Sequence, residues 1–243
     1  MVNRTRIHFN RELLRLHEDV LGLGALARTA VVRATQALMH GDADLAAEVV
    51  AEDNRINDLR FEVEAECFEL LATEQPVAGD MRRIVSLLTI TNDLERIGDH
   101  GKKIARISLL MTGIPRLIPS AAGVPLVESR PPNGASQGAL PWGNVQRMCD
   151  LSLKMLDQAL HSLAANDVVE ARAVCAEDDQ VDALYKQMFN VALTYMLESP
   201  RAIAPGTYQI QVGHELERVA DRATNIAERL IYAATGELLD LNV

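Results

Sequence analysis

The chain has 243 residues, which is enough for one or two domains with a sizeable hydrophobic core. Apolar residues make up 48% of the chain and aromatic residues only 4%, and the prevalence of alanine, leucine, glutamate and arginine predicts an all-α protein. The formal net charge of −10 argues against direct binding to nucleic acid or to anionic lipid.

Three cysteines lie far apart in the sequence without a CxxC spacing, so neither a disulfide framework nor a zinc knuckle is expected. The first residues are charged throughout and contain no apolar signal segment. No run of 18 apolar residues occurs, so we expect no direct insertion into a membrane. These features together predict a protein of the reducing cytoplasm.

The first half of the chain has the pattern of three long helices. Apolar residues recur at spacings of three and four over residues 9–40 and again over about 43–74, and each series marks one buried stripe. A break at Gly41 separates these helices, and the segment 75–80 turns the chain before a third helix. Residues 1–112 are therefore predicted to form a three-helix bundle.

Residues 113–142 differ in kind, because they hold six of the nine prolines and almost no charge. This composition predicts a flexible linker. The alternative is that its apolar residues pack into the groove between the two halves and fix their angle. Helices are then expected over about 143–165, 167–198 and 207–236, so residues 143–243 are predicted to form a second three-helix bundle.

The second half repeats the first. The pentapeptide ERIGD at 95–99 returns as ERVAD at 217–221, and the flanking segments 91–105 and 213–227 share six identities in fifteen. A second match, at an offset of 125, aligns the middle helices of the two halves. A repeat of this length indicates one supersecondary unit used twice. The predicted fold is therefore all-α, with two tandem three-helix bundles related by an internal repeat.

Both copies of the motif place two carboxylates one helical turn apart. Like charges at this spacing cost roughly a few tenths of a kcal/mol per pair, so a bound cation is an obvious reason for having the arrangement twice. The middle helix of each half adds a similar polar pair. In each half, these two residues and the two carboxylates of the motif lie at nearly equal numbers of residues from the turn between the middle and last helices. Antiparallel helices with equal rise per residue would therefore place all four side chains at nearly the same level along the bundle. The sequence therefore predicts an oxygen-rich patch on the surface of each bundle, spanning two helices.

Oxygen ligands of this kind suit Mg²⁺, Mn²⁺ or iron better than a structural Zn²⁺. A histidine one turn before the second motif could add a nitrogen ligand, which favours iron or zinc. The alternative is that these acids are merely solvated, which the repetition disfavours; His100 is expected to face solvent. The first patch consists of Asp53, Asn57, Glu95 and Asp99, and the second patch of Asp178, Asp182, Glu217 and Asp221, with His214 beside it.

The motifs resemble those of a known family. The segment QPVAGDMRRIVSLLTITNDLERIGDH at 75–100 and the segment LERVADRATNIAERL at 216–230 are similar to the signature of the PhoU family, regulators of bacterial phosphate transport. The runs at 52–59 and 177–184 also resemble the middle helices of that family. The resemblance covers both halves and leaves out only the linker, and two copies of E-R-[IV]-x-D within matching flanks are specific.

This resemblance implies a fold of two three-helix bundles that carry multinuclear metal clusters on their surfaces, with ligands from the residues of the two patches. It also implies repression of the phosphate-starvation response, by coupling a phosphate ABC transporter to a membrane sensor histidine kinase. The expected partners are therefore the kinase and the ATPase subunit of the transporter, which would hold the protein peripheral to the inner membrane. We also expect a homodimer.

Two other functions stay open. One is that of an accessory protein for a low-affinity phosphate permease, a neighbouring family with similar bundles. The other is a carboxylate-bridged dimetal oxidase or hydrolase, but ferritin-like sites need Glu-x-x-His on core-facing helices. None of the six histidines has a glutamate three residues before it. We therefore predict that the protein is not an enzyme and has no catalytic residues.

Overall fold

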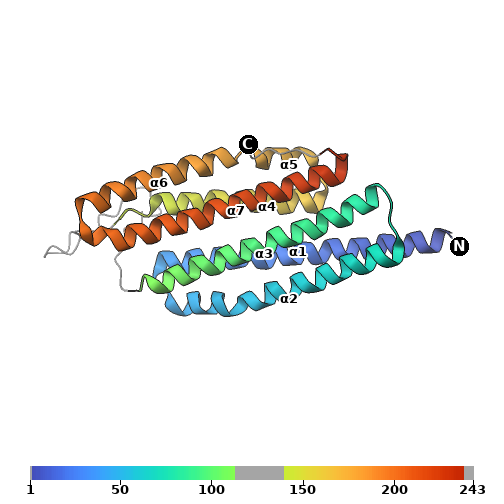
Figure 1. Cartoon of the computed structure of the whole chain (residues 1–243), viewed down its shortest axis with the longest axis horizontal. Coiled ribbons are helices and arrows are strands. Elements are labelled where there is room, and N and C mark those ends of the chain that lie inside the picture. The colour runs from blue at the N-terminus through green and yellow to red at the C-terminus, as the bar shows by residue number, and fades with distance from the viewer. Residues whose placement is uncertain (1, 113–139, 238–243) are drawn as a thin grey trace.

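The computed structural model describes the backbone of residues 2–112 and 140–237, and the side chains from residue 6 onward. Within these ranges every regular element is helical, and the helices form two bundles that lie side by side (Figure 1). None of these described helices is both long and apolar enough to span a membrane. The first bundle consists of α1 (Val2–His40), α2 (Ala43–Glu74) and α3 (Gly79–Leu110). The second consists of α4 (Gly143–Ala165), α5 (Val168–Cys175), α6 (Asp178–Glu198), the short 3-10 helix η1 (Pro200–Ala202) and α7 (Ile203–Thr235).

Equivalent aspartates begin the second helix of each repeat. The Asp42 carboxylate accepts a hydrogen bond from a backbone N–H in the first turn of α2 at 2.9 Å, and Asp167 accepts one in the first turn of α5 at 2.8 Å. Such caps satisfy an N–H group that has no partner within its helix. The preceding residues, Gly41 with φ 69° and Asn166 with φ 52°, adopt the left-handed conformation that these two residue types tolerate best. The two repeats therefore turn with the same local chemistry.

The single helix predicted over 167–198 is wrong, because the chain is interrupted between α5 and α6. Helix α6 begins at Asp178, whereas α2 passes through the equivalent position without a break. The consecutive acids Glu177, Asp178 and Asp179 favour a helix start here, since the positive end of the helix dipole stabilises carboxylates in a first turn. The Glu177 carboxylate also forms an ion pair with Lys154 of α4, whose Nζ lies 2.7 Å away.

The two bundles meet along a shared hydrophobic core. Helix α3 packs along α7, and α1 contacts α4 (Figure 1), while buried apolar residues of both bundles belong to one contiguous cluster. Within the first bundle α3 approaches α1 closely at Gly101, where an added Cβ would lie 3.0 Å from backbone atoms of Ala30 and Val31. Helix α3 thus packs against α1 and α2 within its own bundle, and its opposite face is covered by α7 of the second bundle.

Most of the predicted linker, residues 113–139, lies outside the described residues, so its role as a strap stays a prediction. The structure describes its last three residues. Leu140 and Trp142 are fully buried, and the Pro141 carbonyl accepts a hydrogen bond from Gln209 Nε2 at 2.6 Å. The end of the segment is therefore packed onto the second bundle and is not part of a free linker.

Candidate functional site

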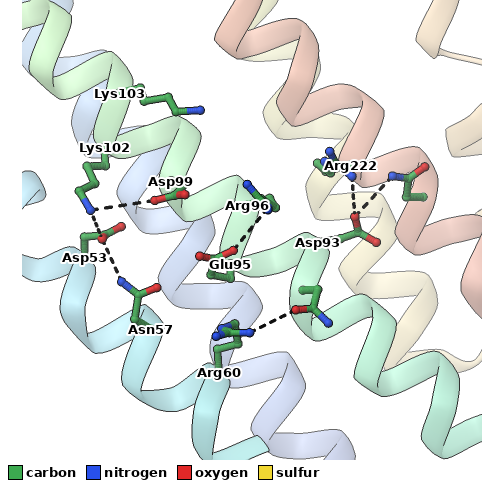
Figure 2. A network of polar contacts seen from close by, with 12 residues as sticks. Asp53, Asn57, Arg60, Asp93, Glu95, Arg96, Asp99, Lys102, Lys103 and Arg222 are labelled. Atoms are coloured by element: carbon green, nitrogen blue, oxygen red, sulfur yellow. Dashed lines mark hydrogen bonds and ion pairs between the residues drawn. The ribbon is translucent and has the colours of Figure 1, made fainter. Parts of the chain in front are cut away.

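The first patch joins α2 to α3 around a lysine. Asp53 of α2 is only 4% exposed, and Asn57, one turn further along α2, donates a hydrogen bond from Nδ2 to Asp53 Oδ2 at 3.1 Å. Lys102 of α3 places its Nζ 2.5 Å from the same oxygen and 4.0 Å from Asp99 Oδ1, as Figure 2 shows. The ammonium group therefore bridges the two helices within the first patch.

Glu95 lies one turn before Asp99 on α3 and is half-buried. Burial raises the pKa of Glu95, and the charge of Asp99 adds to this effect, whereas Arg96 and Arg60 oppose it. Arg96 Nε lies 3.8 Å from Glu95 Oε2 (Figure 2), a longer contact than the one between Lys102 and Asp53. The carboxylates of the first patch are thus crowded, but cationic side chains lie among them.

Within the described residues, the second patch has no lysine that bridges its two helices as Lys102 does in the first. Burial, together with the charges of Asp221 and Asp182, raises the pKa of Asp178 to about 6. Burial also raises the pKa of Asp221, against an opposing effect of Arg218. Lys186 approaches Asp182 to 3.7 Å, but its side chain is mostly in solvent. Among the described residues, no lysine or arginine forms an ion pair with Asp178 or Asp221.

Glu217 and His214 form a pair beside these three aspartates. His214 Nδ1 lies 3.1 Å from Glu217 Oε2 on the same face of α7, and the imidazole ring is 6.3 Å from the Tyr185 ring, centroid to centroid. Burial raises the pKa of Tyr185, and the charge of Glu217 contributes. The nitrogen predicted as a possible ligand therefore lies next to a carboxylate of the second patch.

The structure places the predicted ligands of each half on neighbouring helices, as the residue counting implied. The expectation that both patches lie wholly on the surface is wrong for Asp53, which is buried where α3 and the Lys102 side chain cover it. Over the described ranges, no three side chains of His, Cys, Asp or Glu are grouped so that they could hold a metal ion. Coordination at either patch would need rotation of carboxylate side chains, and metal binding stays a prediction.

The prediction that His100 faces solvent is wrong. His100 is 7% exposed, and its Nδ1 lies 2.6 Å from Glu215 Oε2 of α7. Lys103 Nζ also approaches that carboxylate, at 3.5 Å. Burial alone would raise the pKa of Glu215, but the bonds from His100 and Lys103 outweigh it, and the pKa is lowered. His100 is buried because α7 covers the face of α3 that looks external when the first bundle is considered alone.

Two polar pairs connect α3 to α7, and the repeat relates them to each other. Besides His100 with Glu215, Arg222 Nη1 donates to Asp93 Oδ1 at 3.1 Å (Figure 2). Aligning the two motifs matches Asp93 with Glu215 and His100 with Arg222, so an acidic residue of each repeat meets a basic residue of the other. Reciprocal contacts of this kind are typical of a two-fold axis between like surfaces. The seven-residue spacing within each helix was a signal in the sequence that these residues share a face.

Both bundles match one family model. The PhoU domain model matches residues 20–108 and 145–230, which are the two repeats without the segment between them. The chain belongs to the PhoU family. The double match also confirms the predicted all-α fold with an internal repeat.

Named relatives extend over nearly the whole chain. The protein named "Phosphate-specific transport system accessory protein PhoU homolog" in Caulobacter vibrioides (strain NA1000 / CB15N) is 33% identical over 98% of this chain and 95% of its own length. The protein of that name in Rhizobium meliloti (strain 1021) is 32% identical, over 94% and 87% respectively. These names describe an accessory protein, which supports the prediction that the chain is not an enzyme.

Solved PhoU structures share the fold. The crystal structure of PhoU from Pseudomonas aeruginosa has a TM-score of 0.81 and 34% identity, covering 94% of this chain and 100% of that one. The phosphate transport system regulatory protein PhoU from Streptococcus pneumoniae has a TM-score of 0.78 and 31% identity, covering 96% and 99%. The arrangement of two bundles is therefore that of the PhoU family.

The two PhoU repeats of this chain differ in how well they suit a metal ion. In the second patch, Asp178 and Asp221 form no ion pair with a described lysine or arginine, and carboxylate oxygens are the ligands that hard metal ions prefer. In the first patch, the ammonium of Lys102 is already within hydrogen-bonding distance of the buried carboxylate. The residue types of the second patch suit a metal better than those of the first, although in both patches the side chains would have to rotate to coordinate one.

Proposed function

We propose that this protein is an accessory and regulatory component of a phosphate-specific transport system. Two PhoU domains, and similarity over nearly the whole chain to proteins named for that role, support this function. In this role it would couple a phosphate ABC transporter to a sensor histidine kinase and repress the phosphate-starvation response while phosphate is plentiful. It would act in the cytoplasm, peripheral to the inner membrane through these partners.

The outer faces of α2 and α6 support a role in protein contacts. Phe61 and Phe68, two turns apart on α2, are 58% and 59% exposed. On α6, Leu193 and Leu197 are exposed one turn apart. Apolar side chains grouped on an exposed face often mark protein interaction sites. Through these faces the protein would dock the transporter ATPase subunit and the kinase, and pair with a second copy in a homodimer.

Iron, zinc, manganese or magnesium ions would bind where the patch carboxylates cluster, because a metal ion supplies positive charge to them. In the second patch the aspartates would need to rotate their carboxylates toward the metal, whereas in the first patch Lys102 would also have to move away. The ligands would come from Asp178, Asp182, Glu217, Asp221 and His214 in the second patch; a metal in the first patch could use Asp53, Asn57, Glu95 and Asp99 only after displacing Lys102.

A deletion strain tests the regulatory role. Without the protein, phosphate-starvation genes should be transcribed in high phosphate, and the wild-type chain should restore repression. Phe61→Ser with Phe68→Ser should fail to restore it if the α2 face docks a partner. Val169→Ser, which removes another exposed apolar side chain, is the matched control and should restore repression. Normal repression in the deletion strain would contradict the proposal.

Co-purification identifies the partners. From phosphate-replete cells, the tagged protein should bring down the transporter ATPase subunit and the sensor kinase, and the double phenylalanine variant should recover less of them. Recovery of a low-affinity phosphate permease in place of the ABC transporter would favour the alternative accessory function.

A further inference from the structure

Lys102 marks a difference in charge between the two repeats directly beside the patches. The alignment that superposes ERIGD on ERVAD matches Lys102 with Thr224. Both residues follow the last aspartate of their motif by three positions, so both lie one turn further along the same helix face. Each therefore lies next to its patch, but only one of them carries a charge.

In the first patch, the lysine lies where a shared cation would be most effective. Its Nζ contacts Asp53 from α2 and approaches Asp99 on α3, which are the same two helices that supply the predicted metal ligands. The Asn57 amide also turns its Nδ2 donor toward Asp53, as expected where a carboxylate is surrounded by donors. Asp53 Oδ2 thus accepts two hydrogen bonds and presents less free acceptor capacity to a metal ion.

In the second patch, Thr224 cannot take this role. Its side chain is fully buried, and its hydroxyl donates to the Ala220 carbonyl at 3.3 Å. A hydroxyl carries no charge, so the repulsion among the carboxylates is not offset by the residue at this position.

We propose that Lys102 acts as the built-in cation of the first patch and keeps metal ions out of it, so that the protein binds metal at the second patch alone. A divalent ion entering the first patch would have to displace the ammonium group and then stay close to it, and like charges in a half-buried site repel strongly. This inference rests on the proposed metal binding. It states that the residue at this position, Lys102 in the first repeat and Thr224 in the second, determines which patch binds a metal ion.

Manganese provides a probe that reports the place of binding as well as its extent. Mn²⁺ broadens NMR signals of nearby methyl groups, and the repeat supplies two equivalent reporters. Ile56 lies beside Asp53 and packs near Gly98 in the first bundle, and Val181 lies between Asp178 and Asp182 on α6. In the wild-type protein, titration of the metal-free chain should remove the Val181 methyl signals and leave the Ile56 signals sharp.

Substitution of the lysine should open the first patch. Lys102→Thr should lose the Ile56 signals at manganese concentrations that leave them intact in the wild type. Lys103→Thr is the matched control, because it removes the same charge from the next position, whose side chain points away from Asp53 and Asp99 (Figure 2). It should behave like the wild type. Circular dichroism establishes that each variant is folded.

The possible outcomes separate this inference from metal binding as such. Simultaneous loss of Ile56 and Val181 signals in the wild type would overturn the role of Lys102 while leaving metal binding intact. A wild type without any broadening, together with loss of Ile56 signals in Lys102→Thr, would support the lysine as the excluding group and contradict a metal at the second patch. No broadening in either protein would overturn both the role of Lys102 and metal binding at the two patches.

Discussion

The first and second patches arise from the same repeated motif but differ in electrostatic balance. In the first, Asp53 lies in the middle of the continuous helix α2 and pairs with Lys102. In the second, Asp178 begins α6 after a break, and Thr224 replaces the lysine. Repeated ligand types therefore do not give equivalent surroundings, because Lys102 pairs with the buried aspartate of the first patch and an uncharged threonine stands at the equivalent position beside the second.

The interface between α3 and α7 shows the opposite behaviour, since there the two repeats complement each other. Asp93 pairs with Arg222, and Glu215 pairs with His100. Each repeat supplies one acidic and one basic residue at matching positions. The repeat is thus symmetric where it packs against itself and asymmetric at the two patches.

Removal of the predicted metal ligands of the second patch should have the largest effect, which is on the metal content of the protein. Glu217→Ala combined with Asp221→Ala should remove metal from the second patch and keep the helical content, because neither side chain belongs to the hydrophobic core. Metal content by mass spectrometry and circular dichroism measure the two properties. The matched double variant, Glu95→Ala with Asp99→Ala, should retain the metal. Equal metal content in all three proteins would show that the second patch is not the site.

Removal of the lysine should destabilise the metal-free protein more than the equivalent change in the second repeat. Among the described residues, Lys102→Ala leaves the buried Asp53 carboxylate with Asn57 as its remaining hydrogen-bond partner. We expect a loss of about 2 kcal/mol in the free energy of unfolding. Thr224→Val keeps the shape and removes a hydroxyl, so about 1 kcal/mol is expected. Urea denaturation measures both, and a larger loss for Thr224→Val would reverse the comparison.

The pH dependence of stability should separate the patches further. Because the folded pKa of Asp178, about 6, lies above its usual 3.8, the folded state binds this proton more tightly than the unfolded chain. The resulting stabilisation is present below about pH 4 and is lost as the pH rises through 6. In chelator-treated protein, Asp178→Asn should therefore raise the Tm at pH 7.5 relative to wild type, and less so at pH 5.

The exposed neighbour Asp179 provides the control for this measurement, since Asp179→Asn changes the formal charge equally. It should shift the Tm less than Asp178→Asn at pH 7.5. An Asp178→Asn variant that is less stable than wild type at pH 7.5 would show that the carboxylate is not repelled in the folded protein.

Cleavage of the predicted linker should have the smallest effect on the folded protein. Trypsin should cut first at Arg116 or Arg130 if residues 113–139 form a strap. Because α3 and α7 pack along each other, the two halves should stay together after cleavage, as size-exclusion chromatography would show. Separation of the halves would mean that the contact between the bundles is weak. Resistance of both arginines would instead indicate that the segment is docked in the groove.

Residue patterns were sufficient for the long helices, because each buried stripe and each cap is local. The second helix of the second repeat is capped by Asp167, as the repeat implied, and α4 has the predicted limits of residues 143–165. The break before Asp178 was missed because the apolar stripe continues across it. Three consecutive acids favour a helix start at this point, and Glu177 contacts Lys154 on another helix, which the periodicity of a single helix does not show.

The sequence by itself determined the all-α class, the repeat, the pairing of acidic residues on neighbouring helices and membership of the PhoU family. These properties follow from spacing along a helix, which is fixed by 3.6 residues per turn. The tertiary structure alone decided that Lys102 reaches Asp53 on another helix and that α7 buries His100. Both depend on which helix faces which, and a single helix cannot show whether a polar face will meet solvent, a charge of opposite sign or a second copy of its own repeat.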